Sequence, residues 1–344
     1  MKKLLTILLI LVMIMSLSLT GCGGQEADVA SDEGSVEDET VYTIRVAYVV
    51  AESHASHIVM RDIFKKELEE TGRFVVELYP NGQLGGDRQA VEAVSLGNLE
   101  MTMAGEAVIS GFVPEFELVG LPYLFTSLDS VHQALDGEFG AALNKMLETQ
   151  NIYNLGWGEV GFRNISNSKH EIRTPDDLNG IKIRTMETPA HIAFFKALGA
   201  NPTPMAFNEL FTALQQGTVD AQENPTALTY NSKFYEVQDY MTVSEHVYTA
   251  APILISKDFL DSLPEDLRAK VVETAEKTKD AQRELIYQQN TDFENEMVKE
   301  GVTVTKLTLE EKAAFKKVSD EQVYPDVIEK YGEDLIQLAQ KYNQ

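Results

Sequence analysis

The 344-residue chain contains a single cysteine, Cys22, so it can form no intramolecular disulfide. The folded part must therefore be stabilised by its packed cores, which a hydrophobic content of 44% can supply. Basic residues are also few, because 29 Lys and Arg face 54 Asp and Glu, for a formal net charge of -25. This acidity argues against nucleic acid and anionic lipid surfaces as partners. Each arginine that faces a ligand is correspondingly informative.

The N-terminus has the organisation of an export signal. Lys2 and Lys3 precede an apolar run over 4–15, and small residues lead up to Cys22. Residues 1–21 are therefore expected to be a signal peptide. Between Gly23 and Thr40 there are seven acidic residues and no basic one, without hydrophobic periodicity. We expect residues 22–40 to be an acidic, disordered tether.

From residue 41 onward, strand and helix patterns alternate, which predicts an α/β fold of about two domains with a largely parallel sheet. Polar loops follow the expected strands at 51–57, 84–88 and 104–107, and such loops gather at one edge of a parallel sheet. Farther along, residues 265–300 contain neither Gly nor Pro. This predicts one long helix that could brace two lobes.

The stretch 181–225 organises the rest of the chain. Alternation over 181–184 predicts a short strand with Arg184 facing away from the core. Helical spacing follows over 189–199, then an extended Pro-containing link, a helix over 207–216 and a strand ending at Asn224. A strand, helix and strand with polar residues at the strand ends is typical of a ligand crevice.

Four blocks of this stretch, KIR, LGANPTPMAF, ALQQG.VD and QENP, resemble the signature of the solute-binding proteins of TRAP transporters, the DctP family. The resemblance extends from about Tyr42 to the C-terminus. It implies an α/β, two-lobed, periplasmic-binding-protein-like fold of type II, with a cleft between the lobes and a long C-terminal bracing helix. The implied lobes are 41–161 with 250–289 and 162–249 with 290–344, joined by crossing segments near 158–164 and 245–251.

The resemblance also implies a function. The protein is expected to be an extracytoplasmic receptor, without a cofactor and not an enzyme, that captures a small organic acid and delivers it to TRAP membrane permease subunits. The acid would be a C4-dicarboxylate or a sugar acid such as a uronate. The block LTGC resembles a bacterial lipoprotein signal, which implies that Cys22 is lipidated and anchors the protein to the cell membrane, in the periplasm if the organism has an outer membrane.

Three residues match ligand contacts of that family. Arg184 matches the arginine that clamps the carboxylate, and the planar fork of a guanidinium suits two parallel hydrogen bonds to such a group. Arg163 matches a second ligand arginine, and Asn224 an amide that donates to the same carboxylate. The other candidates are an aromatic that matches a pocket residue and four polar residues on first-lobe loops: Phe207, Glu52, His54, Asp87 and Glu106.

Two other classes of function remain as alternatives. His54 and His57, with Glu52 nearby, could bind a metal ion in a metal-binding lipoprotein, although no third strong ligand lies close in sequence. An exported hydrolase is the other alternative, but the chain has no G-x-S-x-G and no H-E-x-x-H motif. The run Gly156 to Gly161 fits G-x-G-x-x-G, yet the residues after it predict extended chain, so we reject a dinucleotide site.

Overall fold

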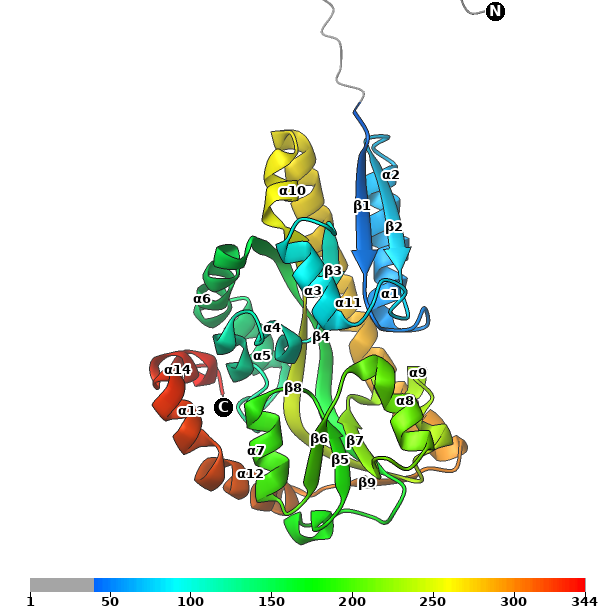
Figure 1. Ribbon diagram of the computed structural model, residues 1–344, viewed down its shortest axis with the longest axis vertical. Helices are drawn as coiled ribbons and strands as arrows, with labels where there is room; N and C mark the ends of the chain where they lie inside the picture. The colour runs from blue at the N-terminus through cyan, green and yellow to red at the C-terminus, as the bar shows by residue number, and fades with distance from the viewer. Residues whose placement is uncertain (1–39, 344) are drawn as a thin grey trace, which may run out of the picture. The chain divides into compact units, whose positions relative to one another are not determined.

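Nine strands form one mixed sheet within residues 40–343, the part of the chain that the computed structural model describes (Figure 1). Their order is β2-β1-β3-β8-β4-β7-β5-β6, and β9 pairs with β8. The strands are β1 (Tyr42–Ala47), β2 (Phe74–Tyr79), β3 (Met101–Met103), β4 (Ile152–Asn167), β5 (Lys182–Thr185), β6 (Asn201–Pro204), β7 (Ala221–Asn224), β8 (Tyr240–Ser256) and β9 (Thr303–Lys306). The expected signal peptide, Cys22 and nearly all of the tether lie outside the described residues.

Two long antiparallel strands, β4 and β8, connect the two halves of the sheet. One end of β8 pairs with β3, at Ile255 and Met101, whereas the other end pairs with β9. Strand β4 pairs with β7 through Asn164 and Asn224. We call the part built on β1, β2 and β3 the first lobe and the part built on β5, β6 and β7 the second lobe. The expected crossing segments lie in the middle of β4 and β8.

The expectation of a largely parallel sheet holds within each lobe but is wrong at the centre. Strand β1 is parallel to β2 and β3, and β5 is parallel to β6 and β7. The pairs β3–β8, β4–β8 and β4–β7 are antiparallel. The reason is that the chain crosses between the lobes twice, in opposite directions. Two strands expected over 152–157 and 160–166 are one bulged strand, and β8 was not predicted.

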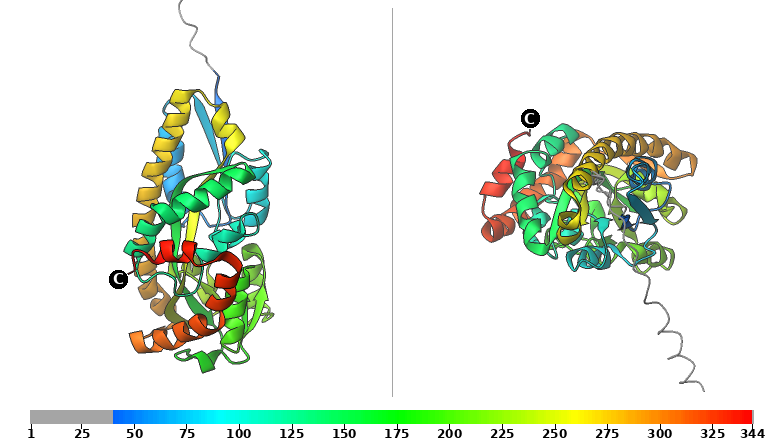
Figure 2. Two further views of the ribbon diagram at one scale, coloured as in Figure 1. Left: turned by 90° about the vertical axis from the view of Figure 1, so that its left-hand side faces the viewer. Right: turned by 90° about the horizontal axis from the view of Figure 1, so that it is seen from above.

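Helices cover both faces of the sheet (Figures 1 and 2). The α-helices are α1 (Ala55–Val59), α2 (Lys66–Glu69), α3 (Asp87–Ser95), α4 (Glu106–Ile109), α5 (Leu128–Leu135), α6 (Glu138–Leu147), α7 (Pro189–Ala197), α8 (Phe207–Gln215), α9 (Thr226–Asn231), α10 (Lys257–Ser262), α11 (Glu265–Lys299), α12 (Leu309–Gln322), α13 (Tyr324–Tyr331) and α14 (Asp334–Gln340). A π-helix, Met60–Lys65, joins α1 to α2, and 3-10 turns occur at Pro114–Leu118, Glu148–Gln150, Pro175–Leu178 and Phe234–Glu236. Within residues 40–343, no helix combines the length and apolarity that crossing a bilayer requires.

The long helix expected over 265–300 is confirmed as α11, which has 35 residues. Side chains in its second half bind both lobes. Gln289 Oε1 accepts a hydrogen bond of 3.0 Å from the backbone of Ala55 in the first lobe. Asn290 Oδ1 accepts one of 2.8 Å from Ala227 in the second lobe, and its Nδ2 donates to Val160 of β4. Helix α11 therefore braces the region where the lobes join.

The cores follow from this arrangement. One buried cluster fills the first lobe beneath β1, β2 and the start of α11, with Phe64, Val76, Ile253 and Val271 among its members. The largest cluster runs under α3, α5, α6 and α7. It includes residues of both lobes, such as Phe116, which stacks on Trp157, in the first lobe and Phe194 in the second. Because this core is shared between the lobes, β4 and β8 are buried along most of their length.

We expect Gly140→Ala to lower the free energy of unfolding by about 3 kcal/mol. A Cβ at Gly140 would lie 1.7 Å from the Leu135 carbonyl oxygen and 2.8 Å from Trp157 Nε1, so α6 would have to move off β4. Chemical denaturation of the purified variant measures the loss. The control is Gly105→Ala, whose Cβ meets nothing closer than Thr249 Cγ2 at 3.7 Å. Equal stability of both variants would contradict the packing of α6 described here.

Candidate ligand-binding site

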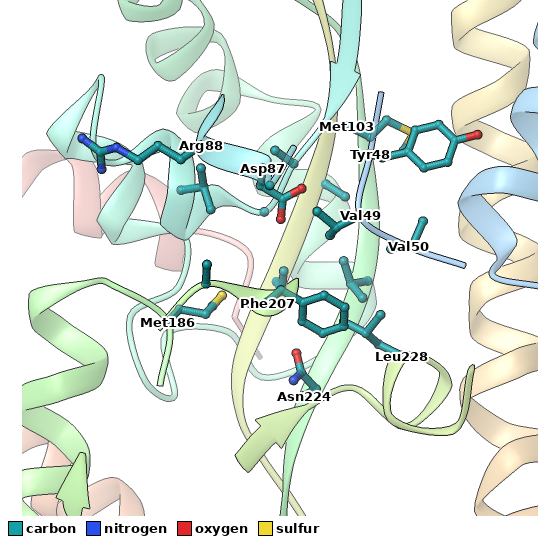
Figure 3. A pocket seen from close by; sticks show the side chains of 18 of the residues that line it. Tyr48, Val49, Val50, Asp87, Arg88, Met103, Met186, Phe207, Asn224 and Leu228 are labelled. Atoms are coloured by element: carbon teal, nitrogen blue, oxygen red, sulfur yellow. The ribbon is translucent and has the colours of Figure 1, made fainter. Parts of the chain in front are cut away.

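A pocket of about 240 Å³ lies where the two lobes meet and receives residues from both (Figure 3). The first lobe contributes the chain after β1, the start of α3 and the loop after β3. The second lobe contributes the ends of β5 and β7 and the start of α8, and the crossing strands form the floor. Six of the eight predicted ligand residues line it: Arg184, Arg163, Asn224, Phe207, His54 and Asp87.

Arg184 is buried at the end of β5, and no acidic residue among 40–343 forms an ion pair with it. Its Nε and Nη2 both donate to the carbonyl oxygen of Met205, at 3.0 and 2.8 Å. Its Nη1 has no hydrogen-bond partner among residues 40–343. Burial, together with the charge of Arg163, lowers the pKa of Arg184 to about 10. A carboxylate beside Nη1 would satisfy this donor and stabilise the charge.

Arg163, on β4, is also buried but forms an ion pair inside the protein. Its Nη2 lies 2.8 Å from Glu223 Oε1, its Nε also contacts the Glu223 carboxylate, and its Nη1 donates to Thr249 Oγ1 at 3.1 Å. His246 Nε2 lies 3.3 Å from Glu223 Oε2. Burial alone would raise the pKa of Glu223, but Arg163 and His246 hold it well below its usual range. Arg163 therefore lines the pocket with its charge already neutralised.

Asn224 and Phe207 form the second-lobe side of the pocket. Asn224 is buried at the end of β7, and its Nδ2 donates one hydrogen bond to Gln222 Oε1, which leaves a second N–H. Phe207 is the first residue of α8 and packs against Phe234, with ring centroids 5.8 Å apart. Phe207 is partly exposed, and it lines the pocket in addition to packing on Phe234.

His54 and Asp87 bring polar atoms from the first lobe. His54 caps α1, and its Nδ1 accepts a hydrogen bond of 3.2 Å from Ser56. Burial lowers the pKa of His54 to about 4, so the ring is neutral and Nε2 carries the hydrogen. Asp87 begins α3, and burial raises its pKa to about 7. Neither His54 Nε2 nor Asp87 Oδ1 has a partner in the described part of the chain.

Glu52 and Glu106 do not line the pocket. Glu52 is exposed in the turn after β1. Glu106 begins α4 and is fully buried behind the pocket, where burial raises its pKa to about 8. A Cβ at Gly120 would lie 2.7 Å from Glu106 Oε1 and 3.1 Å from His191 Nε2, so these two side chains meet around that glycine. Loop position alone could not distinguish an inward from an outward side chain.

Several pocket residues were not predicted from the sequence, among them Tyr48, Met186 and Thr249. Thr249 lies on β8, which is buried on both faces and therefore shows no alternation of apolar and polar residues. Glu223, the partner of Arg163, stands within the QENP block, so its position was noted but not its ion pair. No local signal in the sequence could have revealed the pair, because it depends on the register of β4 against β7.

The metal and dinucleotide alternatives find no support in the geometry. His57 Nδ1 lies 2.9 Å from the Tyr48 hydroxyl, and no group of three or more His, Cys, Asp or Glu residues suited to a metal occurs among residues 40–343. The run Gly156 to Gly161 lies within β4, so no helix N-terminus follows it. This confirms the expected extended chain.

We expect Glu223→Gln to lower the free energy of unfolding by about 3–5 kcal/mol, because Arg163 would remain buried without a counter-ion. Urea denaturation measures this loss. Glu236→Gln is the matched control, since Glu236 pairs with Lys233 on the surface at 3.8 Å and should contribute no measurable stability. If Glu223→Gln were as stable as the control, the pair would not hold β4 to β7 as described.

The chain matches the family model for DctP, described as bacterial extracellular solute-binding protein, family 7, over residues 46–330. It is 34% identical over 293 residues to the C4-dicarboxylate-binding periplasmic protein DctP of Rhodobacter capsulatus, covering 82% of this chain and 87% of that protein. It is 33% identical over 263 residues to the 2,3-diketo-L-gulonate-binding periplasmic protein YiaO of Escherichia coli, covering 76% and 80%.

Among solved structures, the sugar acid binding protein DctPAm of Advenella mimigardefordensis, in complex with galactonate, superposes with a TM-score of 0.85. It is 34% identical in sequence, and the match covers 88% of this chain and 99% of that one. The fold is therefore the two-lobed fold that the resemblance implied. The chain belongs to family 7 of the bacterial extracellular solute-binding proteins, the DctP family, which serves TRAP transporters as solute-binding proteins and not as enzymes.

Proposed function

We propose that this protein captures a small organic acid in the pocket and holds the acid's carboxylate on Arg184. The observation that carries the proposal is the buried Nη1 of Arg184, which has no partner in the described part of the chain and belongs to a guanidinium bound only to a neutral carbonyl. The second N–H of Asn224 and the remaining Nη1 hydrogen of Arg163 supply further donors. The DctP relative from Rhodobacter capsulatus and the galactonate complex both indicate acids as ligands.

Closure of the lobes would turn binding into a signal. A ligand held on Arg184 and Asn224 of the second lobe reaches His54 and Asp87 of the first lobe, and contacts made only in the closed state shift the equilibrium toward it. Bulges in β4, including Gly161 with φ +111, give the crossing strands points at which to bend. The lobe boundaries proposed for this motion are 41–161 with 250–289 and 162–249 with 290–344. The closed form would deliver its ligand to the TRAP membrane permease subunits.

Export and anchoring complete the proposal. Residues 1–21 would direct secretion, and lipidation of Cys22 would tether the receptor to the outer face of the cell membrane. The acidic segment 22–40 would let the binding domain reach the permease. The proteins that the family model covers are extracellular, which is consistent with this location.

Arg184→Ala should weaken binding of the cognate acid by about 100-fold or more, because the carboxylate loses the side chain that neutralises it. Arg184→Lys should lower the affinity for the acid by about tenfold or more, since an ammonium cannot form the parallel pair of hydrogen bonds. The measurement is calorimetric titration of residues 41–344, unfolded and refolded to remove any carried ligand. The panel contains dicarboxylates, uronates, aldonates and keto acids.

The control for this titration is Arg61→Ala. Arg61 is exposed, pairs with Asp62 at 2.7 Å and lies outside the pocket, so its loss should leave affinity unchanged. An Arg184→Ala protein that folds normally and binds the acid with wild-type affinity would refute the proposed clamp. Turnover of an acyl or glycosyl substrate by the wild-type protein would refute the transport role.

Cys22→Ser should release the protein from the membrane, because serine provides no thiol for lipid attachment. Cell fractionation with detection of the protein, and mass spectrometry of the N-terminal peptide, follow the change. The wild type should sediment with membranes and carry acyl mass on Cys22. Recovery of unmodified wild-type protein in the soluble fraction would rule out the anchor.

A further inference from the structure

The positive charge available to a ligand is limited to one buried guanidinium. Three arginines line the pocket, but Arg163 is neutralised by Glu223. Arg88 is exposed, with its guanidinium carbon 5.8 Å from the centroid of the Phe112 ring, and Figure 3 shows it pointing away from Phe207. Only Arg184 is both buried and without an ion pair among the described residues that line the pocket. The buried part of the pocket can therefore neutralise a single carboxylate of a ligand, the one that binds Arg184.

The first-lobe side of the pocket presents one acid, Asp87. Figure 3 shows the Asp87 carboxylate directed toward Phe207 and Asn224 across the cavity. Its Oδ1 is shielded from solvent and has no partner among residues 40–343. Glu187, which follows β5 in the second lobe, also lines the pocket, at its exposed rim. Both carboxylates act on the charge of Arg184 without contacting it as an ion pair. A ligand bound to Arg184 consequently faces the Asp87 carboxylate on its other side, which is negative when Asp87 is ionised.

His54 adds a donor beside this acidic side. Because its Nδ1 accepts from Ser56, Nε2 carries the hydrogen and can donate to a neutral oxygen. An acceptor at Asp87 and a donor at His54 together match hydroxyl groups, which both donate and accept. A second carboxylate could accept from His54 but has no hydrogen to donate to Asp87 when Asp87 is ionised.

We propose that the pocket selects a polyhydroxylated monocarboxylate, an aldonate or a uronate, and that Asp87 determines this choice by excluding C4-dicarboxylates. The proposal rests on the proposed function, since it assumes that Arg184 holds the ligand's first carboxylate. Sequence identity does not make this choice, because relatives of similar identity are named for a C4-dicarboxylate and for a sugar acid. The repulsive contact at Asp87 provides the discrimination.

The test compares galactonate, gulonate and galacturonate with succinate and malate by calorimetry at about pH 8, where Asp87 is mostly ionised. In the wild type at least one sugar acid should bind about 100-fold more tightly than either dicarboxylate. Asp87→Asn removes the charge and keeps the shape, so dicarboxylate affinity should rise about tenfold or more. Asp87→Ala removes the carboxylate that accepts a hydrogen bond from a hydroxyl of the ligand, so it should weaken sugar-acid binding by about tenfold or more.

Glu92→Gln is the matched control, because Glu92 is exposed on the same helix, α3, and lies outside the pocket. It should leave every affinity unchanged. Dicarboxylates that bind the wild type as tightly as the sugar acids, an unchanged ratio in Asp87→Asn, or no binding by any of the five acids would overturn the inference. Acid binding that persists in Arg184→Ala would instead refute the proposed function, so the two failures are distinguishable.

Discussion

Burying a guanidinium without a counter-ion costs several kcal/mol, because the charge loses its hydration. Arg184 is held in this state at the end of β5, with two of its nitrogens bound to the Met205 carbonyl and the third without a partner in the described part of the chain. The protein solves the same problem differently for Arg163, which Glu223 neutralises. One arginine therefore stabilises the join between β4 and β7, and the other remains available for a ligand.

The fold places the charge of Arg184 in the pocket between the two lobes, where a relative movement of the lobes would change its surroundings. Strands β4 and β8 cross between the lobes, and the pocket lies over their centres with one side built by each lobe. Helix α11 fastens both lobes through Gln289 and Asn290, so the region where the lobes join is restrained. The closure proposed above would turn the lobes about this restrained junction.

Much of this organisation was predictable from local patterns. The absence of Gly and Pro over 265–300 predicted α11, and alternation predicted β5 with Arg184 facing away from the core. The link at 201–205 proved to contain an edge strand, β6, because Pro202 and Pro204 are tolerated at the edge of a sheet. Strand β8 was missed because it is buried on both faces and shows no alternation. The Arg163–Glu223 pair depends on strand register, which no local pattern specifies.

The central claim is that Arg184 is the residue on which an acid is held. A crystal structure with the cognate acid bound tests it most directly, because it locates the ligand carboxylate without altering the protein. The account predicts a carboxylate oxygen about 2.7–2.9 Å from Arg184 Nη1, with the ligand enclosed between the lobes. A carboxylate bound instead at the exposed Arg88, with Arg184 Nη1 still without a partner, would contradict it.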